Sequence, residues 1–343
     1  MSEPIKVAVV GVGLIGEQHA EEWNRDRRTT ITLVCDVDER RARAVAHKLG
    51  CDFTTSLDEV AASDVRIASV TTPDFAHREP AVLLAQAGKH LLIEKPLATT
   101  AADAWAIVRA ARGAGIRATV SLGNRWMPQI QQAREVVQAG EIGEPVMFFS
   151  RLSDTIDVPT KMLSWAGRSG PQWFLFSHTM DFMRWILGQD AVEVYAVGQK
   201  KILLERGIDA YDAIQATVKF ERCFGTFETA WILPSAWPSL IESEHTIYGS
   251  RGRLHVDRLR QGFELTSDVA GRHMYSRPSL WQQYTLPTTY FGALRNLRDA
   301  VDKGDDLLVS LEDGLAVVSM IEAVETSIAT GRPVDPRPLM APA

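Results

Sequence analysis

The chain has 343 residues, of which 45% are hydrophobic and 23% are charged, and its formal net charge is −6. This composition is typical of a globular protein long enough for two domains. The acidic balance argues against nucleic acid and anionic membranes as partners, and no apolar stretch is long enough to cross a bilayer. The three cysteines have no paired spacing, which indicates reduced thiols and a cytoplasmic location.

The first part of the chain alternates apolar runs with stretches that favour helix. Strands are expected at Ile5–Val10, Ile31–Cys35, Arg66–Val70, His90–Ile93 and Arg117–Ser121, and helices at Leu14–Arg25, Asp38–Leu49, Ala76–Ala87 and Ala101–Ala114. Nearly continuous apolar strands between helices predict a parallel sheet covered on both faces. We therefore predict a Rossmann-type, dinucleotide-binding domain over residues 1–122.

Residues 123–343 show a different pattern, with longer strands and hairpins. Two hairpins are expected, one from Ala213–Phe220 with Gly225–Leu233 and one from His245–Tyr248 with Arg253–Val256. Helices are expected at Gln129–Gln138, Phe291–Asp302 and Glu312–Ala329. The pattern predicts an α/β domain with a large, open, mostly antiparallel sheet, to which we assign substrate binding and oligomerisation.

The open sheet also predicts self-association. Apolar side chains alternate along two neighbouring strands, at Phe227, Thr229 and Trp231 and at Ile214, Val218 and Phe220. Helices of the same chain cover one face of such a sheet, so a second copy of the chain is the simplest cover for the other face. We expect a homodimer or a homotetramer.

A glycine-rich loop follows the first expected strand, with the sequence Gly11-Val12-Gly13-Leu14-Ile15-Gly16. In this G-x-G-x-x-G pattern Gly11 permits the tight turn, Gly13 lets a pyrophosphate approach the backbone, and Gly16 lets the helix pack close to the strand. The helix that starts at Leu14 and Ile15 presents N–H groups to the phosphates. The alternative is a glycine-rich turn that binds nothing.

An acidic residue stands at the distance expected for a dinucleotide site. Asp36 lies 20 residues past Gly16, at the end of the second apolar run. A carboxylate there accepts a hydrogen bond from the ribose 2′-OH of NAD and repels the 2′-phosphate of NADP. The sequence therefore predicts NAD as the cofactor.

Several motifs outside the glycine loop carry a family resemblance. They are Thr71-Thr72-Pro73-Asp74-Phe75-Ala76-His77, Leu92-Ile93-Glu94-Lys95-Pro96-Leu97, Gly140-Glu141-Ile142-Gly143-Glu144-Pro145, and Gly170-Pro171 followed by His178-Thr179-Met180-Asp181. In this order and spacing the chain resembles the Gfo/Idh/MocA family of NAD(P)-dependent sugar and polyol oxidoreductases. The resemblance implies a Rossmann domain followed by an open-sheet α/β domain, in a homo-oligomer. It also implies cofactor contacts at Thr71, Thr72, Pro73, His77, Glu94 and Lys95.

Two residues are the catalytic candidates. Lys95 follows a strand, where an ammonium group stabilises developing alkoxide charge, and His178 carries an imidazole suited to take the hydroxyl proton. A solvated surface lysine and a buried core histidine are the alternatives. One departure concerns Phe174, which stands where many family members have an aspartate four residues before the histidine.

Further residues near the motifs are candidates for substrate binding together with Lys95 and His178. They are Arg125, Trp126, Trp165, Arg168, Trp173 and Asp181. Tryptophan faces suit the C–H faces of a sugar ring, and arginine binds hydroxyls or a carboxylate. Core packing and ordinary surface charge are the alternatives for these residues.

The sequence as a whole predicts an NAD-dependent oxidoreductase acting on a carbinol of a sugar, polyol or related carbohydrate. No cluster of side chains has the spacing of metal ligands, so no metal is expected. Two rival functions stay open. One is a non-catalytic sensor that binds nucleotide and sugar, since Phe174 replaces the usual aspartate, and the other is a redox-assisted enzyme that cleaves glycosides.

Overall fold

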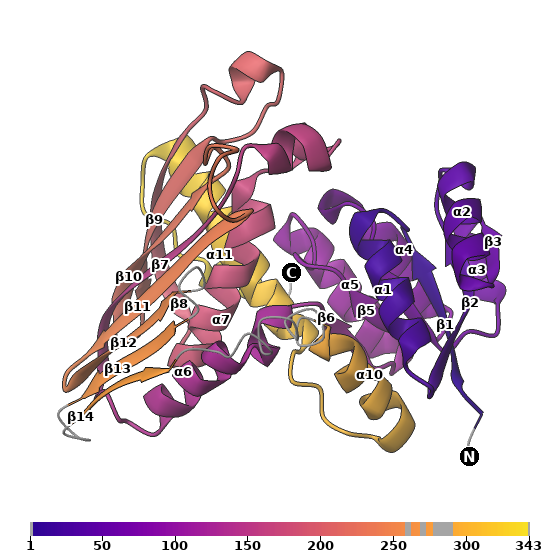
Figure 1. The fold of residues 1–343 in the computed structure, drawn as a ribbon, viewed down its shortest axis with the longest axis horizontal. Coiled ribbons are helices and arrows are strands. Elements are labelled where there is room, and N and C mark those ends of the chain that lie inside the picture. The colour runs from indigo at the N-terminus through magenta and orange to yellow at the C-terminus, as the bar shows by residue number, and fades with distance from the viewer. Residues whose placement is uncertain (1–2, 258–261, 268–271, 277–290, 342–343) are drawn as a thin grey trace. The chain divides into compact units, whose positions relative to one another are not determined.

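The computed structural model describes residues 3–257, 262–267, 272–276 and 291–341. The chain forms two compact units, residues 1–123 with 290–315 and residues 124–289 with 316–343. Each unit is built around its own sheet (Figure 1). No helix in the described part of the chain combines the length and the apolar character needed to span a membrane.

The first unit contains a parallel sheet in the order β3-β2-β1-β4-β5-β6. Its strands are β1 (Ile5–Val10), β2 (Thr29–Cys35), β3 (Asp52–Thr54), β4 (Ile67–Val70), β5 (His90–Ile93) and β6 (Ala118–Val120). The helices between them are α1 (Leu14–Arg25), α2 (Glu39–Leu49), α3 (Leu57–Ala62), α4 (Arg78–Gln86) and α5 (Ala101–Ala114). The strand order changes direction between β1 and β4, which is where open parallel sheets bind ligands at their carboxyl ends.

The predicted Rossmann topology is confirmed. Val7, Ala8 and Val9 of β1 have no exposed surface, because helices cover both faces of the parallel sheet. The sequence analysis missed β3 and α3. The three residues of β3 include only one buried side chain, and α3 has six residues, so neither carries a clear apolar period.

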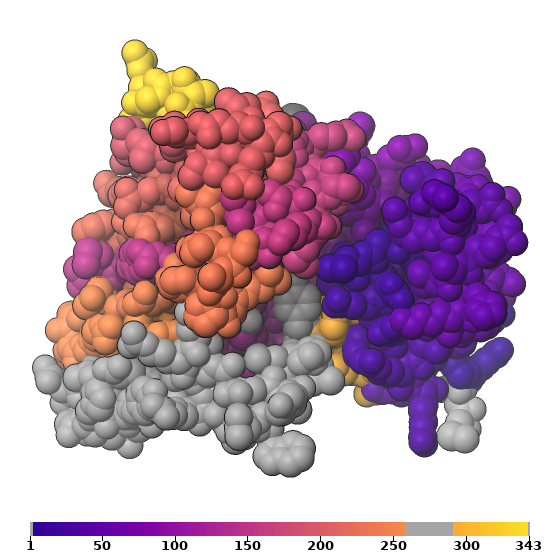
Figure 2. Space-filling model, turned by 45° about the horizontal axis from the view of Figure 1, so that its top comes forward, coloured from indigo at the N-terminus to yellow at the C-terminus, as the bar shows by residue number. Residues whose placement is uncertain are grey.

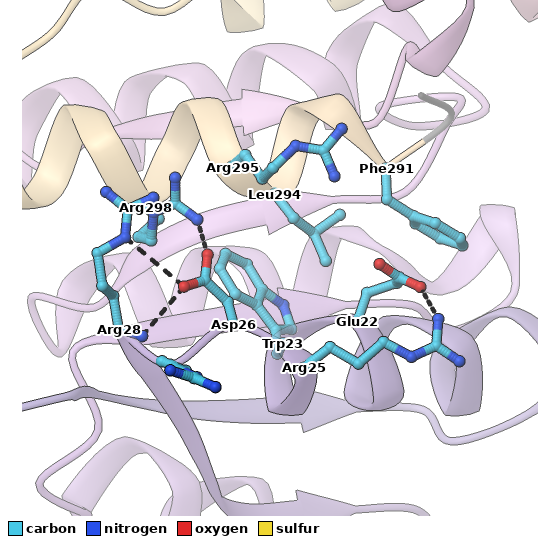
Figure 3. Close-up of a pocket in the computed structure, with 10 residues that line it drawn as sticks. Glu22, Trp23, Arg25, Asp26, Arg28, Phe291, Leu294, Arg295 and Arg298 are labelled. Carbon is cyan, nitrogen blue, oxygen red and sulfur yellow. Dashed lines mark hydrogen bonds and ion pairs between the residues drawn. The ribbon is translucent and has the colours of Figure 1, made fainter. Parts of the chain in front are cut away.

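Residues 290–315 lie in the first unit, whereas the sequence analysis placed them in the second domain. Their helix α10 (Gly292–Lys303) packs on β5 and β6. Arg298 is 2% exposed and forms ion pairs with Asp26 and Asp299, and Arg28 donates to Asp299 at 3.0 Å. Figure 3 shows the Asp26 side of this network, with Arg28 and Arg298, beside a pocket of about 440 Å³ between the end of α1 and α10. A buried guanidinium such as that of Arg298 requires such partners, and no local pattern reveals that Arg298 meets Asp26 or that Arg28 meets Asp299, 271 residues away.

The second unit contains a mixed sheet in the order β14-β13-β12-β11-β7-β10-β9-β8. Its strands are β7 (Pro145–Asp154), β8 (Ala191–Gln199), β9 (Ala213–Phe220), β10 (Phe224–Ala230), β11 (Ile241–Gly249), β12 (Gly252–Asp257), β13 (Gly262–Ser267) and β14 (Arg272–Ser276). Only β10 and β7 pair in parallel among the described strands of this sheet. Figure 2 shows magenta atoms of the chain near residue 150 between orange ones, in keeping with the central place of β7.

Helices α6 (Pro128–Gln138) and α7 (Ser177–Leu187) and the later part of α11 (Leu311–Thr330) cover one face of this sheet (Figure 1). The predicted open, mostly antiparallel sheet is therefore confirmed. The division between the two units falls inside α11. Figure 1 shows no helix on the opposite face of this sheet, which for the described residues is the open face.

The two apolar rows that were expected to contact a second copy of the chain lie instead on the face that the chain's own helices cover. Phe227 and Trp231 have no exposed surface, and the ring centroid of Phe227 lies 5.1 Å from that of Phe148 and 6.2 Å from that of Phe176. That part of the expectation is wrong, because alternation does not reveal which face the chain's own helices cover. The large apolar side chains exposed on the open face are Met147, Tyr195, Val197, Phe224 and Tyr248.

Candidate functional site

The glycine loop forms the turn from β1 into α1. Gly11 has a φ of +88°, and a Cβ atom there would lie 2.7 Å from the backbone N of Thr72. A Cβ atom on Gly16 would lie 1.9 Å from the carbonyl oxygen of Gly11. A Cβ atom on Gly13, by contrast, would meet no described atom within 4 Å. Gly11 and Gly16 are thus required by contacts inside the fold, while Gly13 faces open space.

The start of α1 fits a dinucleotide pyrophosphate. No described side chain caps this helix at Gly13, so the N–H groups of Leu14 and Ile15 retain the directions that suit a bound anion. The open space at Gly13 lets a phosphate reach these groups. The residues present therefore fit the NAD expected from the sequence.

Asp36 is fixed at the carboxyl end of β2. Its side chain is 5% exposed and accepts the backbone N–H groups of Val12 and Asp38, both at 2.9 Å. The guanidinium of Arg41 also donates to it, at 3.2 Å. Asp36 thereby links the glycine loop to the start of α2 (N-cap Asp38). The sequence analysis missed Arg41, which places a cation beside the predicted ribose site.

The segment after β4 packs against the glycine loop. The Thr71 hydroxyl donates to the carbonyl oxygen of Gly11 at 2.7 Å, and the Thr72 hydroxyl donates to that of Ala76 at 3.0 Å. Pro73 opens a single turn of 3₁₀ helix. These contacts hold the segment at the carboxyl ends of β1 and β4, where the sequence analysis expected cofactor contacts.

His77 joins this segment to the turn after β5. Its side chain is 1% exposed. Its Nδ1 lies 2.8 Å from the carbonyl oxygen of Pro96, and its Nε2 lies 2.9 Å from that of Thr72. Both ring nitrogens therefore contact the protein backbone.

Glu94 and Lys95 follow β5 directly and are 4% and 9% exposed. The Glu94 carboxylate lies 3.0 Å from Nε2 of His19 on α1 and accepts the N–H of Lys95 at 3.1 Å. Burial alone would raise the pKa of Glu94, but the hydrogen bond and charge of His19 and the charge of Lys95 lower it to about 2. Glu94 is therefore an ionised, buried anion. His19 had no assigned role in the sequence analysis.

The second unit holds His178 on α7 and Phe174 in the turn of π-helix that precedes it, η5 (Gln172–Phe176). The ring centroid of Phe174 lies 6.4 Å from that of Trp165 and 5.7 Å from that of Trp231. Trp231 belongs to an apolar cluster with Leu152, Leu175 and other aliphatic side chains, and the half-buried Phe174 packs against this cluster. A carboxylate at position 174 would therefore lie against apolar side chains.

Arg125 and Asp181 contact each other. They are 1% exposed each, and the guanidinium donates to the carboxylate at 2.6 and 3.0 Å. The pair fixes the 3₁₀ turn η2 (Gly123–Trp126) to α7. The two side chains were predicted to bind substrate, and in the structure they bind each other.

Trp173 is also buried and hydrogen-bonded within the second unit. Its side chain is 3% exposed and its indole N–H donates to Glu325 at 2.9 Å. Trp126 and Trp165 are half-buried, and Arg168 is exposed. Among the described residues, no three His, Cys, Asp or Glu side chains are grouped so as to hold a metal ion.

Two family models match this chain. The model of an oxidoreductase family with an NAD-binding Rossmann fold matches residues 5–122, and that of the GFO/IDH/MocA C-terminal domain matches residues 130–255. An inositol 2-dehydrogenase of Rhizobium meliloti (strain 1021) is 25% identical over 334 residues, which cover 96% of this chain and 98% of that protein.

Solved structures agree over nearly the whole length. An oxidoreductase domain protein from Kribbella flavida has a TM-score of 0.87 and 26% identity, covering 97% of this chain and 99% of that one. GenD2 from gentamicin A biosynthesis, solved in complex with NAD, has a TM-score of 0.84 and 27% identity, covering 98% and 97%. The fold and both halves of the chain thus match one family of oxidoreductases.

The Asp36–Arg41 contact generates a prediction about cofactor choice. In Asp36→Ser the repulsive carboxylate is gone while Arg41 remains, so the ratio of NADPH to NADH affinity should rise by about tenfold or more. Titrations of protein fluorescence with each cofactor measure the ratio. Asp38→Asn, which keeps the helix cap but removes a nearby charge, is the control and should change the ratio much less. A wild-type protein that prefers NADPH would contradict the argument.

The low pKa of Glu94 predicts a pH dependence of stability. Because the folded-state pKa is about 2 and the ordinary value is 4.5, the ionised carboxylate stabilises the fold by roughly 3 kcal/mol above pH 4.5. This stabilisation is lost as the pH falls through about 2. Urea unfolding between pH 7 and pH 3 should show Glu94→Gln to be less stable at pH 7 and less sensitive to acid than wild type. Glu39→Gln, an exposed change on α2, should follow the wild-type curve, and an identical curve for Glu94→Gln would refute the prediction.

Proposed function

The chain belongs to the Gfo/Idh/MocA family of NAD-binding oxidoreductases, and from this premise we propose that it is an NAD-dependent dehydrogenase acting on a carbinol of a cyclic sugar, polyol or related carbohydrate. The observation that carries the proposal is the placement of Lys95. It follows β5 in the same unit as the glycine loop, at the carboxyl edge of the sheet, and its backbone N–H is bound by a buried carboxylate. A lysine presented in this way matches the requirement for a fixed cation beside a reacting oxygen.

In the proposed chemistry, oxidation removes a hydride from the carbinol carbon and a proton from the hydroxyl oxygen. When bound, NAD accepts the hydride from the carbinol carbon. Lys95 donates a hydrogen bond to the substrate oxygen and stabilises its developing negative charge. His178 accepts the hydroxyl proton during oxidation and returns it during reduction. The sugar-binding sensor has no need for this pair of groups.

The substrate class is supported by the relatives. The Rhizobium meliloti relative is named an inositol 2-dehydrogenase, and GenD2 is named for gentamicin A biosynthesis, so both names point to polyhydroxylated compounds. The half-buried faces of Trp126 and Trp165 suit the C–H face of a saturated ring, and Arg168 is exposed to bind hydroxyl groups. We propose these three residues as substrate contacts, whereas Arg125 and Asp181 bind each other and Trp173 donates to Glu325.

We further propose that the enzyme is a cytoplasmic homo-oligomer. Its three cysteines are free thiols, which suits a reducing compartment. Exposed apolar side chains of Met147, Tyr195, Phe224 and their neighbours lie on the open face of the second sheet. Two copies of this face, related by a twofold axis, bury these side chains against each other.

The proposed chemistry is tested by NADH absorbance over a panel of inositols, sugars and polyols. Lys95→Met and His178→Asn should each lower kcat by about 10²–10⁴-fold, because each removes one of the two groups that manage charge on the substrate oxygen. NADH affinity should change little. Arg109→Ala, an exposed change on α5, serves as the control. Full activity in either variant, or no substrate in the panel, would count against the proposed function, and release of an aglycone without net NADH would favour glycoside cleavage.

The proposed assembly is tested by light scattering coupled to gel filtration. Wild type should have at least twice the mass of the 38.0 kDa chain. Val197→Glu with Phe224→Glu places charges on the open face and should yield monomers, since like charges would meet across the twofold interface. Leu204→Glu, an exposed apolar position outside the sheet, should leave the mass unchanged. A monomeric wild type at micromolar concentration would rule the assembly out.

A further inference from the structure

The turn that carries Lys95 is flanked by two buried histidines from different elements. His19 lies on α1 and contacts Glu94, the residue before the lysine, whereas His77 precedes α4 and contacts Pro96, the residue after it. Resting on the proposed role of Lys95, we propose that His19 and His77 are positioning residues that clamp this turn from both sides. The clamp fixes the direction of the lysine side chain; neither imidazole acts on substrate.

The His19 arm is a chain of two hydrogen bonds. His19 has no exposed surface, and its ring stands edge-on to Phe291 with 5.6 Å between centroids, so the ring orientation is set by packing. Its Nε2 contacts one oxygen of Glu94 at 3.0 Å, and the other oxygen accepts the N–H of Lys95 at 3.1 Å. Glu94 thereby links His19 on α1 to the backbone of Lys95 and fixes the position of that backbone.

The His77 arm joins two backbone segments directly. Nδ1 lies 2.8 Å from the carbonyl oxygen of Pro96 and Nε2 lies 2.9 Å from that of Thr72. Carbonyl oxygens only accept hydrogen bonds and a neutral imidazole carries a single N–H, so the clamp requires either the tautomer whose Nδ1–H donates to Pro96 or the imidazolium, which donates to both carbonyl oxygens. With both ring nitrogens directed at the backbone, His77 is described better as a brace between loops than as the cofactor contact expected from its motif.

The clamp matters because lysine is long. Four methylene groups separate its backbone from its ammonium group, so a small rotation at the turn displaces the ammonium by a much larger distance. A misplacement of about 1 Å at a reacting centre costs about 10²-fold in rate. If His19 were replaced, the buried carboxylate of Glu94 would also reorient toward other hydrogen-bond donors. Because this carboxylate accepts the backbone N–H of Lys95, its movement would shift the backbone of Lys95.

A crossed set of amide variants tests the clamp. The amide nitrogen of glutamine reaches the place of a histidine Nε2, and that of asparagine reaches the place of Nδ1. His19→Gln therefore preserves the donor to Glu94 and His19→Asn does not, whereas His77→Asn preserves the donor to Pro96 and His77→Gln does not. Each pair has the same chemistry and differs by one methylene group, so general loss of packing affects both members.

The measurements are kcat and KM with inositol or the most active member of the panel, the NADH dissociation constant, and hydrogen exchange of the Lys95 amide. We expect His19→Asn and His77→Gln to lose about 10- to 100-fold in kcat with NADH affinity within threefold of wild type. His19→Gln and His77→Asn should recover most of that loss. The Lys95 amide should exchange at least tenfold faster in His19→Asn than in His19→Gln.

The outcomes separate the clamp from its alternatives. Equal losses in both members of each pair would mean that the histidines only fill space, and weakened NADH binding with unchanged kcat would mean that His77 is a cofactor contact; either result overturns the proposal. Lys95→Met is measured alongside. Normal activity in Lys95→Met means that the proposed role of Lys95 is wrong and the clamp falls with it, and wild type that oxidises no member of the panel means that the proposed function is wrong. An inactive Lys95→Met with four fully active amide variants means that only the clamp is wrong.

Discussion

The ionised carboxylate of Glu94 is the group on which the carboxyl edge of the first sheet depends. A buried anion is tolerated only when charged or hydrogen-bonding groups surround it. Here they come from α1 through His19 and from the charge and backbone N–H of Lys95. One carboxylate thereby ties α1 to the turn after β5, 75 residues away in the sequence, and it does so next to the residue that the proposed chemistry needs most.

The loops at the same edge support one another in a similar manner. Gly11 and Gly16 have no room for a side chain because Thr71, Thr72 and the loop's own backbone lie against them. Asp36 accepts a backbone N–H from the glycine loop, so one network fixes the acid at the end of β2 relative to the glycine loop. Gly13 differs from these two glycines, since a Cβ atom on it would meet no described atom within 4 Å beyond its own neighbours and helix backbone. The loop is thus open at Gly13, where a dinucleotide pyrophosphate requires access.

The parts of this architecture that were predictable from sequence depend on local spacing. The period of apolar residues predicted the parallel strands and the hairpins, and the distance from Gly16 to Asp36 predicted the acid at the end of β2. The contacts that were missed join residues far apart: Arg298 with Asp26, His19 with Glu94, and Arg125 with Asp181. A sequence shows the charges of these residues but not their distances, so it identified Arg125 and Asp181 as candidates without revealing that they contact each other. The same limit explains the error over Phe227, since alternation defines two faces of a strand but not which of them is covered.

Phe174 illustrates how one departure from a motif is accommodated by its surroundings. Its ring contacts Trp165 and Trp231 within an apolar cluster that includes Leu152 and Leu175, so the cluster and the phenylalanine suit each other. The acid on α7, Asp181, is held by Arg125 on the side of η2. His178 therefore emerges from a helix whose preceding turn is apolar and whose following turn is fixed by a buried ion pair.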